Sequence, residues 1–204
     1  MAGPTKWRTP RDANQATGLI GPNTILQLLP VLERAGGTDF RDRVMAAAGI
    51  FEAPNDEGMI PEGPAARVHQ ALRAIEPEMA PSLAWAAGER TAQYILARRI
   101  PQAAQLVLQM LPAGLAGRLL SKAIARHAWT FAGSGTFHLA GPLTFEIADN
   151  PIVLGEVSDV PLCHWHRAVF EVLFGTLVDP RLRCEEQTCC AMGAPACRFV
   201  LKRG

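Results

Sequence analysis

Apolar residues recur every three or four positions along the first two thirds of the chain, which predicts a succession of helices over residues 18–131. In one of these segments Val68 and Leu72 fall on the same helical face. Another segment is interrupted at Gly36 and Gly37. We expect one helix to end there and the next to begin, because glycine readily adopts the backbone conformation that closes a helix.

After residue 131 the apolar period shortens to two residues, as in strands that bury one face. Phe137 and Leu139 alternate with polar neighbours, and Leu143 and Phe145 do the same after a Gly-Pro pair. We expect a hairpin with a three-residue loop at 140–142, which pairs Leu139 with Leu143 and Phe137 with Phe145. The polar residues between them then share the other face of the sheet: His138, Thr144 and Glu146.

A helix and a second hairpin complete the predicted fold. The helix is expected to begin at Ser158 or Asp159 and to end near Val178, with Cys163 in its first turn. The last 24 residues then have the pattern of two strands joined by a Gly-Ala-Pro turn. This order of elements predicts an α+β fold in which N-terminal helices pack with an antiparallel sheet.

The composition is that of one globular domain spanning residues 1–204, with a helical part at 18–131 and a sheet-containing part at 132–203. Hydrophobic residues make up 49% of the chain and the formal net charge is +1, so neither disorder nor nucleic-acid binding is expected. The N-terminal residues lack the apolar run of a secretory signal, which indicates a cytoplasmic protein. In that reducing compartment, clustered cysteines are more often metal ligands or reactive thiols than disulfides.

Residues 100–117 carry no charge and approach the length of a membrane-spanning helix. Pro101, Pro112 and three glutamines argue against a transmembrane segment. We predict instead two buried helices that meet near Pro112, and a peripheral contact with a membrane stays open. The next helix has a basic edge formed by Arg118, Lys122 and Arg126. This edge is either an ordinary solvated face or a clamp for carboxylates or anionic lipid headgroups.

Four of the five cysteines lie within residues 184–197. Cys189 and Cys197 flank a glycine-containing turn, Glu186 precedes Cys189 by three positions, and Cys163 approaches from the preceding helix. Three thiolates and one carboxylate would form a closed, four-coordinate zinc site. The site requires a bulge that turns Glu186 and Cys189 to the same face, because residues three apart in a regular strand point to opposite faces.

Other interpretations of the cysteines stay open. The spacing of the clustered cysteines matches neither common ferredoxin pattern, which disfavours an iron–sulfur cluster. Catalysis by Cys163 with His164 or His166 has weak support, because sequence neighbours on a helix point in different directions. Cys184 and Cys190 are, in the simplest interpretation, small buried hydrophobic residues.

The C-terminal part of the chain resembles the 4-vinyl reductase domain family. The family pattern is a cysteine at the start of a helix, then Glu-x-x-Cys-x-x-x-Gly-x-x-x-Cys and an aromatic residue. The residues that fit it are Cys163, Glu186, Cys189, Gly193, Cys197 and Phe199. The resemblance implies a structural zinc ion held by Cys163, Glu186, Cys189 and Cys197. It also implies a ligand-binding fold, often dimeric, shared with vesicle-tethering subunits of the Golgi trafficking complex and related to haem nitric-oxide sensors.

Nearly the whole chain, including residues 18–37 and 150–185, resembles the family members of the bacteriochlorophyll pathway. This resemblance implies either reduction of the 8-vinyl group (4-vinyl in the older numbering) of divinyl chlorophyll precursors or binding of a Mg-tetrapyrrole. We find no nicotinamide or flavin motif. The leading hypothesis is therefore a carrier or assembly factor for an intermediate of the Mg-protoporphyrin or divinyl protochlorophyllide type. Its partners would be pathway enzymes such as magnesium chelatase and the following methyltransferase, and a ligand-free interaction module for these enzymes is the third alternative.

A tetrapyrrole carrier needs an apolar pocket, an axial ligand for magnesium and cations for the propionate groups. The candidates are His127 and His138 as axial ligands, Trp129 and Phe137 as stacking surfaces, and Arg118, Lys122 and Arg126 as anchors. A lone histidine is more often a hydrogen-bonded structural residue than a ligand, so each histidine also has this simpler interpretation.

Overall fold

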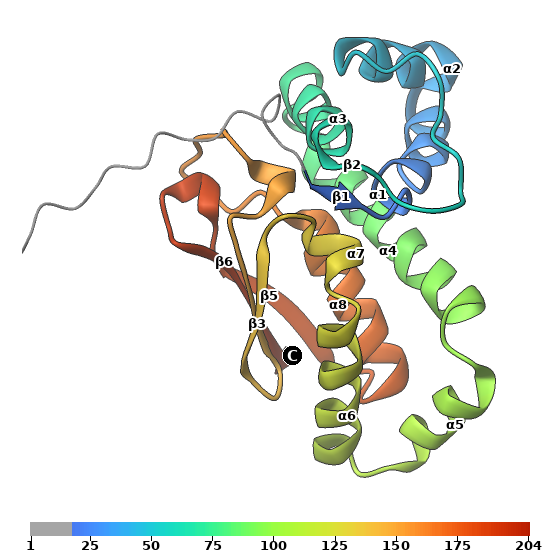
Figure 1. The fold of residues 1–204 in the computed structure, drawn as a ribbon, viewed down its shortest axis with the longest axis vertical. Coiled ribbons are helices and arrows are strands. Elements are labelled where there is room, and N and C mark those ends of the chain that lie inside the picture. The colour runs from blue at the N-terminus through green and yellow to red at the C-terminus, as the bar shows by residue number, and fades with distance from the viewer. Residues whose placement is uncertain (1–17) are drawn as a thin grey trace, which may run out of the picture.

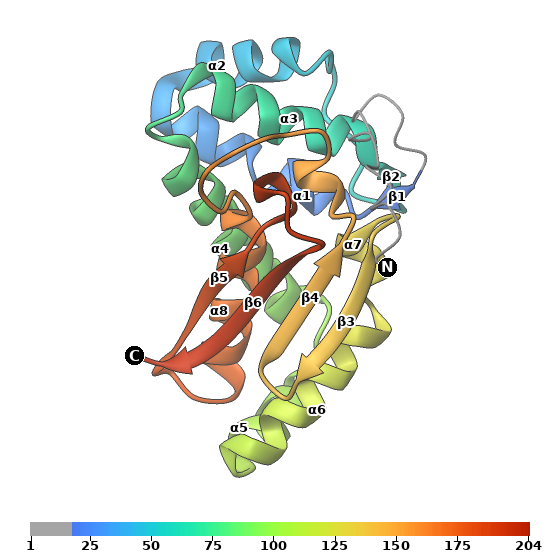
Figure 2. The ribbon, with the colours of Figure 1, turned by 90° about the vertical axis from the view of Figure 1, so that its left-hand side faces the viewer.

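The computed structural model describes residues 18–204, in which helices cover one face and one end of an antiparallel sheet (Figure 1, Figure 2). The helices are α1 (Asn23–Leu26), α2 (Leu29–Ala47), α3 (Glu62–Ile75), α4 (Ala80–Arg98), α5 (Gln102–Met110), α6 (Ala113–Arg126), α7 (Trp129–Ala132) and α8 (His164–Leu177). The strands are β1 (Leu19–Ile20), β2 (Ile60–Pro61), β3 (Thr136–Gly141), β4 (Thr144–Ala148), β5 (Leu182–Thr188) and β6 (Ala196–Arg203). The predicted α+β class and its order of elements are confirmed.

The four-stranded sheet has the order β3-β4-β6-β5 with antiparallel neighbours, and α8 covers one of its faces (Figure 2). Aromatic rings form this contact. Phe145 of β4 lies opposite Phe199 of β6, and both pack against Phe170 of α8 at ring-centroid distances of 4.9 and 5.3 Å. All three side chains are buried, so the two-residue period of the strands supplies one wall of the core and α8 the other.

Helix α4 packs against the other side of α8 and joins the helical part to the sheet. The helices approach closely at Gly88. A Cβ atom at this position would lie 2.4 Å from the carbonyl oxygen of Trp165 and 2.7 Å from the Cβ of Ala168. Trp165 also donates a hydrogen bond from its indole nitrogen to the Thr91 hydroxyl at 3.1 Å. The small residues of α4 therefore set the distance between the two helices.

The predicted register of the first hairpin is wrong by two residues. Phe137 lies opposite Ile147 instead of Phe145, and Leu139 lies opposite Phe145 instead of Leu143. An irregularity between Leu139 and Gly141 absorbs one extra residue, and β4 begins immediately after Leu143. The predicted faces are nevertheless correct, because a shift by an even number of residues keeps each side chain on its face. His138 accordingly lies opposite Glu146.

The structure confirms one predicted helix boundary and corrects another. Gly36 and Gly37 have non-helical backbone angles, so α2 is interrupted where expected. Helix α8 begins at His164, five or six residues later than predicted. Ser158 does not cap it, because its hydroxyl accepts a hydrogen bond from the nearby Val160 N–H. Cys163 consequently occupies the position immediately before the first turn.

The two helices predicted within residues 100–126 meet at Pro112 as expected, but the prediction that they are buried is wrong for α5. None of its residues is buried, and Leu106 and Met110 are 60% and 85% exposed. Within residues 18–204, no helix is long and apolar enough to cross a bilayer.

Candidate metal centre

Four side chains from three segments meet in the core beside the start of α8. Cys163 precedes α8, Glu186 lies near the end of β5, Cys189 follows that strand, and Cys197 lies on β6. All four are buried, and their ligand atoms lie within 4.8 Å of one another. The structure thus brings together all four residues that the sequence predicted as zinc ligands.

The distances between the three sulfur atoms suit a tetrahedral metal ion. Cys163 Sγ lies 3.4 Å from Cys197 Sγ and 3.9 Å from Cys189 Sγ, and the sulfurs of Cys189 and Cys197 are 3.8 Å apart. Bonds of about 2.3 Å from a central zinc at tetrahedral angles would separate sulfur atoms by about 3.8 Å. No disulfide joins the five cysteines, so these thiols are free to act as ligands.

A β-bulge brings Glu186 and Cys189 to the same side. Glu186 lies opposite Phe199 and Thr188 lies opposite Arg198, so the strand takes up one extra residue between them. As a result both Glu186 and Cys189 are buried although they are three positions apart. The bulge that the sequence interpretation required is therefore present.

The surroundings of the cluster hold its side chains and supply hydrogen bonds to sulfur. The Glu186 carboxylate accepts a bond from the backbone N–H of Cys163 at 2.8 Å. The Asn150 amide donates to Cys163 Sγ, and the backbone N–H of Cys190 donates to Cys197 Sγ, both at 3.3 Å. Such bonds to a thiolate orient it and reduce the charge that the metal must balance.

The electrostatics of the cluster favour a bound cation. Burial raises the pKa of Glu186 to about 8, with the neighbouring Cys189 thiolate as a second cause. Burial also raises the pKa of Cys163, whereas hydrogen bonds from Cys163 and Cys197 lower that of Cys189. Glu186 Oε1 is buried and has no hydrogen-bond partner within the described part of the chain. A divalent cation would stabilise the ionised form of all four groups and give this oxygen a partner.

The remaining cysteines and the neighbouring histidines lie outside this cluster. Cys184 is buried on β5, and Cys190 contributes only its backbone N–H. His166 Nε2 lies 3.2 Å from the Phe131 carbonyl oxygen, and burial lowers the pKa of His166 to about 4. Among the described residues neither His164 nor His166 forms a hydrogen bond with Cys163, so no Cys–His catalytic pair is present.

The structure does not gather the seven residues predicted to bind a tetrapyrrole. His127 caps α6 and is exposed, and its Nδ1 lies 2.9 Å from the Ala123 carbonyl oxygen. Trp129 is 57% exposed at the start of α7. Phe137 packs into the aromatic core, whereas His138 is exposed on the opposite face of β3. The three cations follow one edge of α6: Arg118, Lys122 and Arg126.

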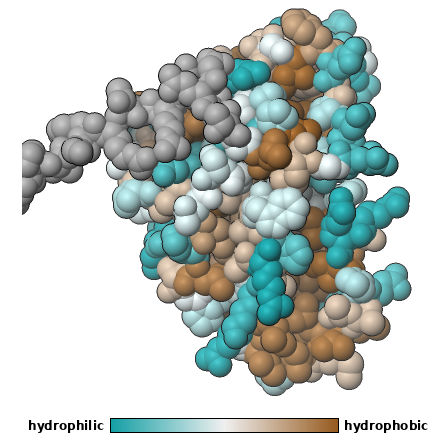
Figure 3. All heavy atoms as spheres, viewed as in Figure 1, coloured by the Kyte–Doolittle hydropathy of each residue, from teal (hydrophilic) through white to brown (hydrophobic). Residues whose placement is uncertain are grey.

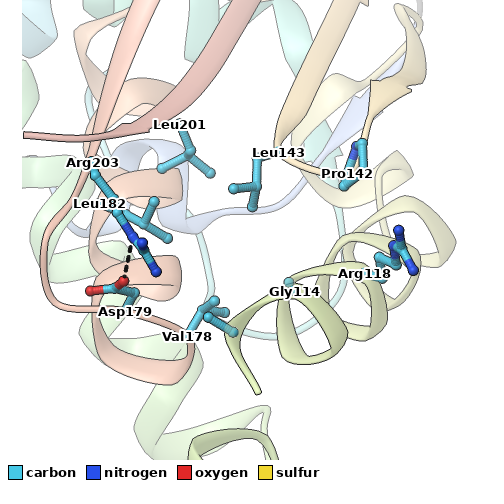
Figure 4. A pocket seen from close by; sticks show the side chains of 11 residues that line it. Gly114, Arg118, Pro142, Leu143, Val178, Asp179, Leu182, Leu201 and Arg203 are labelled. Atoms are coloured by element: carbon cyan, nitrogen blue, oxygen red, sulfur yellow. Dashed lines mark hydrogen bonds and ion pairs between the residues drawn. The ribbon is translucent and has the colours of Figure 1, made fainter. Parts of the chain in front are cut away.

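A cavity of about 430 Å³ lies between the start of α6, the β3–β4 turn, the end of α8 and the β5–β6 edge of the sheet (Figure 4). Its lining is mainly apolar, and Arg118 is the one residue of the predicted tetrapyrrole set that takes part in it. The other polar residues are Asp179 and Arg203, which form an ion pair at 2.9 Å. Sequence reasoning missed these two, and the only signal was the small residues Gly114 and Gly117 on α6, where a larger side chain would fill the space.

Comparisons with known proteins place the chain in a family. Residues 143–203 match the model of the 4-vinyl reductase domain. The chain is 55% identical over 184 residues to the bacteriochlorophyll synthase 23 kDa chain of Cereibacter sphaeroides, covering 89% of each chain. It is 50% identical to the Rhodobacter capsulatus protein of the same name, covering 89% of this chain and 86% of the relative.

Solved structures show the same fold at low sequence identity. An H-NOX protein from K. algicida aligns with a TM-score of 0.57 at 11% identity, covering 91% of this chain and 97% of that one. An H-NOX protein from S. oneidensis aligns with a TM-score of 0.52 at 10% identity, covering 91% and 99%. The predicted likeness to haem nitric-oxide sensors is confirmed at the level of the fold. With the domain match and these relatives, the chain belongs to the 4-vinyl reductase domain family that includes the bacteriochlorophyll synthase 23 kDa chains.

Proposed function

We propose that the protein acts in bacteriochlorophyll synthesis as a carrier or assembly factor that binds a Mg-tetrapyrrole intermediate. The names of the two relatives support a role in that pathway. The titles of two structures with this fold refer to haem or porphyrin distortion, which supports a tetrapyrrole as the ligand class. The intermediate would be of the Mg-protoporphyrin or divinyl protochlorophyllide type.

The observation that carries this proposal is the apolar cavity beside α6 (Figure 4). Its volume of about 430 Å³ is within the range of small-molecule sites, and Leu143, Val178 and Leu201 give it apolar walls. Arg118 lies at its edge and forms no ion pair with any described carboxylate, so its guanidinium is available to a propionate group. An apolar ring system with acidic substituents suits this combination.

Axial ligation of the magnesium by His127 or His138 remains part of the proposal. Neither histidine lines the cavity. Ligation by either therefore requires the bound ring to extend beyond the cavity, or α6 and β3 to move when the ligand binds. The double variant His127→Ala/His138→Ala tests this point, because unchanged pigment affinity would remove both residues as ligands.

We propose zinc as the resident metal of the Cys163, Glu186, Cys189 and Cys197 cluster, with a structural role. Four protein ligands leave no open coordination position, so zinc here would tie the start of α8 to β5 and β6 without activating a substrate. The protein's own residues fix the geometry through the bulge in β5 and the hydrogen bonds from Asn150 and Cys190.

A reductase is the second candidate, because the family name refers to the vinyl group. The sheet of the described chain is antiparallel throughout and offers no parallel βαβ unit of the kind that binds dinucleotides. This topology favours binding of a tetrapyrrole over its reduction by a nicotinamide held on the same chain. The third candidate is a ligand-free module that contacts pathway enzymes, with magnesium chelatase and the following methyltransferase as proposed partners, in the cytoplasm and as a homodimer.

An absorption titration of Mg-protoporphyrin with the purified protein, with and without NADPH, separates these candidates. We expect a saturable band shift that NADPH does not change. The variant Gly114→Trp should weaken binding, because a Cβ at Gly114 meets no atom within 4 Å and an indole there would occupy the cavity. The control Ala46→Trp adds the same side chain at an exposed position of α2, away from the cavity, and should bind as the wild type does.

Three results would contradict the proposal. NADPH-dependent conversion of a divinyl substrate by the purified chain would identify a reductase. The absence of any band shift, together with binding to a pathway enzyme, would identify a ligand-free module. Equal affinity of Gly114→Trp and Ala46→Trp would place the ligand outside the cavity.

A further inference from the structure

We propose that α5 and α6 form a docking surface for an anionic lipid bilayer. The two helices form a hairpin at one end of the molecule, and apolar side chains gather there on the surface (Figure 1, Figure 3). We call these side chains the apolar tip: Leu106, Val107, Met110, Leu115 and Leu119. Leu106 and Met110 are one turn apart on α5, and Leu115 and Leu119 are one turn apart on α6, so each pair extends along one face of its helix.

Helix α5 turns its polar side chains toward the protein and its apolar ones toward solvent. The Gln105 amide donates hydrogen bonds to the carbonyl oxygens of Leu96 and Ile100 at 2.7 and 2.8 Å. The Gln109 amide donates to the Thr176 carbonyl oxygen at 3.2 Å. These contacts fix the rotation of α5 and leave Leu106 and Met110 outside. A helix of a water-soluble surface has the opposite polarity, so this exposed face indicates a contact with an apolar medium.

The charges around the apolar tip all have the same sign. Residues 90–145 contain six Lys and Arg residues and no Asp or Glu. They are Arg90, Arg98, Arg99, Arg118, Lys122 and Arg126. None of the six pairs with a carboxylate in the described part of the chain. Since the net charge of the whole chain is only +1, the positive charge is concentrated in this segment.

This combination of groups suits an anionic bilayer better than another copy of the chain. The apolar side chains would enter the interface between headgroups and acyl chains, and the long basic side chains would reach the anionic headgroups. Two copies joined through the same face would bring their cations together without any carboxylate between them. The hairpin would lie on the membrane, because α5 has nine residues and spans about 14 Å, less than half of a bilayer core.

Docking through this surface would hold the cavity beside the membrane. Helix α6 contributes Leu115 and Leu119 to the apolar tip, and Ala113, Gly114 and Gly117 to the cavity lining. The inference goes beyond the proposed function and does not depend on it, because the lipid contact involves no bound ligand. The two therefore stand or fall by different experiments.

Flotation of the full-length protein with lipid vesicles tests the inference. The vesicles contain phosphatidylcholine alone, or phosphatidylcholine with about a quarter phosphatidylglycerol. We expect binding to the anionic vesicles only, and weaker binding when NaCl is raised from about 50 to about 500 mM. Leu106→Gln/Met110→Gln should lower the partition coefficient by about tenfold or more, because two apolar side chains no longer enter the interface.

The matched control is Phe51→Gln/Val157→Gln. It also replaces two exposed apolar residues, 86% and 89% accessible, but both lie outside the apolar tip. The control should float as the wild type does, and both double variants should keep the wild-type circular dichroism and melting temperature. Wild-type protein that ignores anionic vesicles would overturn the inference. So would equal binding by the two double variants, or a wild-type dimer that Leu106→Gln/Met110→Gln dissociates while vesicle binding is absent.

Discussion

The Glu186 carboxylate accepts a hydrogen bond from the backbone N–H of Cys163 at 2.8 Å, and this contact joins the last residue before α8 to β5, 23 positions away. One carboxylate oxygen is thereby used to position the start of the helix, and the other is buried without a partner among the described residues. The same side chain thus orients the cluster and offers it a ligand atom. The first prediction concerns this cluster.

Replacement of Cys197 by serine should remove the metal and destabilise the fold. We expect the wild type to contain about one zinc per chain, and Cys197→Ser to contain almost none. The loss should exceed about 3 kcal/mol of unfolding free energy, which lowers the melting temperature by roughly 6–12 °C. Elemental analysis and thermal denaturation measure the two effects.

Cys184→Ser is the control for this experiment, because Cys184 is also buried on the sheet but lies outside the cluster. It should keep its zinc even though a buried hydroxyl costs some stability. A wild-type protein that is free of metal after purification and equally stable with and without added zinc would contradict the prediction.

Gly88→Ala should destabilise the protein by about 1–3 kcal/mol or more. In a helix, alanine is ordinarily favoured over glycine by about 1 kcal/mol. At Gly88, however, the added Cβ would lie 2.4 Å from the Trp165 carbonyl oxygen, and this backbone atom cannot move unless α8 moves. Urea denaturation of both proteins gives the difference in unfolding free energy.

The same substitution at Gly175 of α8 is the matched control. A Cβ atom there meets nothing within 4 Å, so Gly175→Ala should stabilise the protein by about 0.5–1 kcal/mol. Effects of the same sign at Gly88 and Gly175 would show that the close packing of α4 and α8 does not limit the residue at position 88.

Glu62→Gln should cost about 1–3 kcal/mol of unfolding free energy. The buried Glu62 carboxylate accepts bonds from the Gly18 and Ser134 N–H groups, and also from the Ser134 hydroxyl at 2.6 Å. An amide would place a second donor against one of these donors and leave it unsatisfied. Chemical denaturation measures the loss, and Glu57→Gln, at an exposed position, should stay within about 0.5 kcal/mol of the wild type. A loss no larger than that of the control would mean that these contacts do not contribute.

Stability should fall as the pH falls below about 6.5. Burial lowers the pKa of His69 to about 3 and that of His166 to about 4. The unfolded chain, with histidine pKa values near 6.5, binds protons that the folded protein excludes until the pH approaches 3–4. At pH 5 each histidine should therefore cost about 2 kcal/mol relative to neutral pH.

Urea denaturation at pH 7.5 and pH 5 measures this dependence in the wild type and in His69→Gln. The glutamine amide can still donate to the Thr24 carbonyl oxygen, which lies 3.1 Å from His69 Nε2, but it does not titrate. We expect the variant to lose roughly half of the pH dependence. An unchanged dependence would assign the effect to other groups.

The sequence by itself determined the class of each element and the ligand set of the candidate metal centre. Periods of about 3.6 and of 2 follow directly from helix and strand geometry, so the helices and both hairpins were predictable. The spacing from Glu186 to Cys197 is local, and a bulge was the only way for Glu186 and Cys189 to share a side. Residues that are close in sequence and chemically distinctive leave few arrangements.

Only the tertiary structure decided the relationships between distant segments. The irregularity after Leu139 set the hairpin register, since several pairings bury the same apolar face and the sequence does not rank them. The hydrogen bonds of Gln105 and Gln109 to carbonyl oxygens of other segments turned the apolar face of α5 outward. The cavity beside α6 likewise arises from four separate segments. These features depend on which surfaces meet in three dimensions, and a periodicity records only that a surface is apolar.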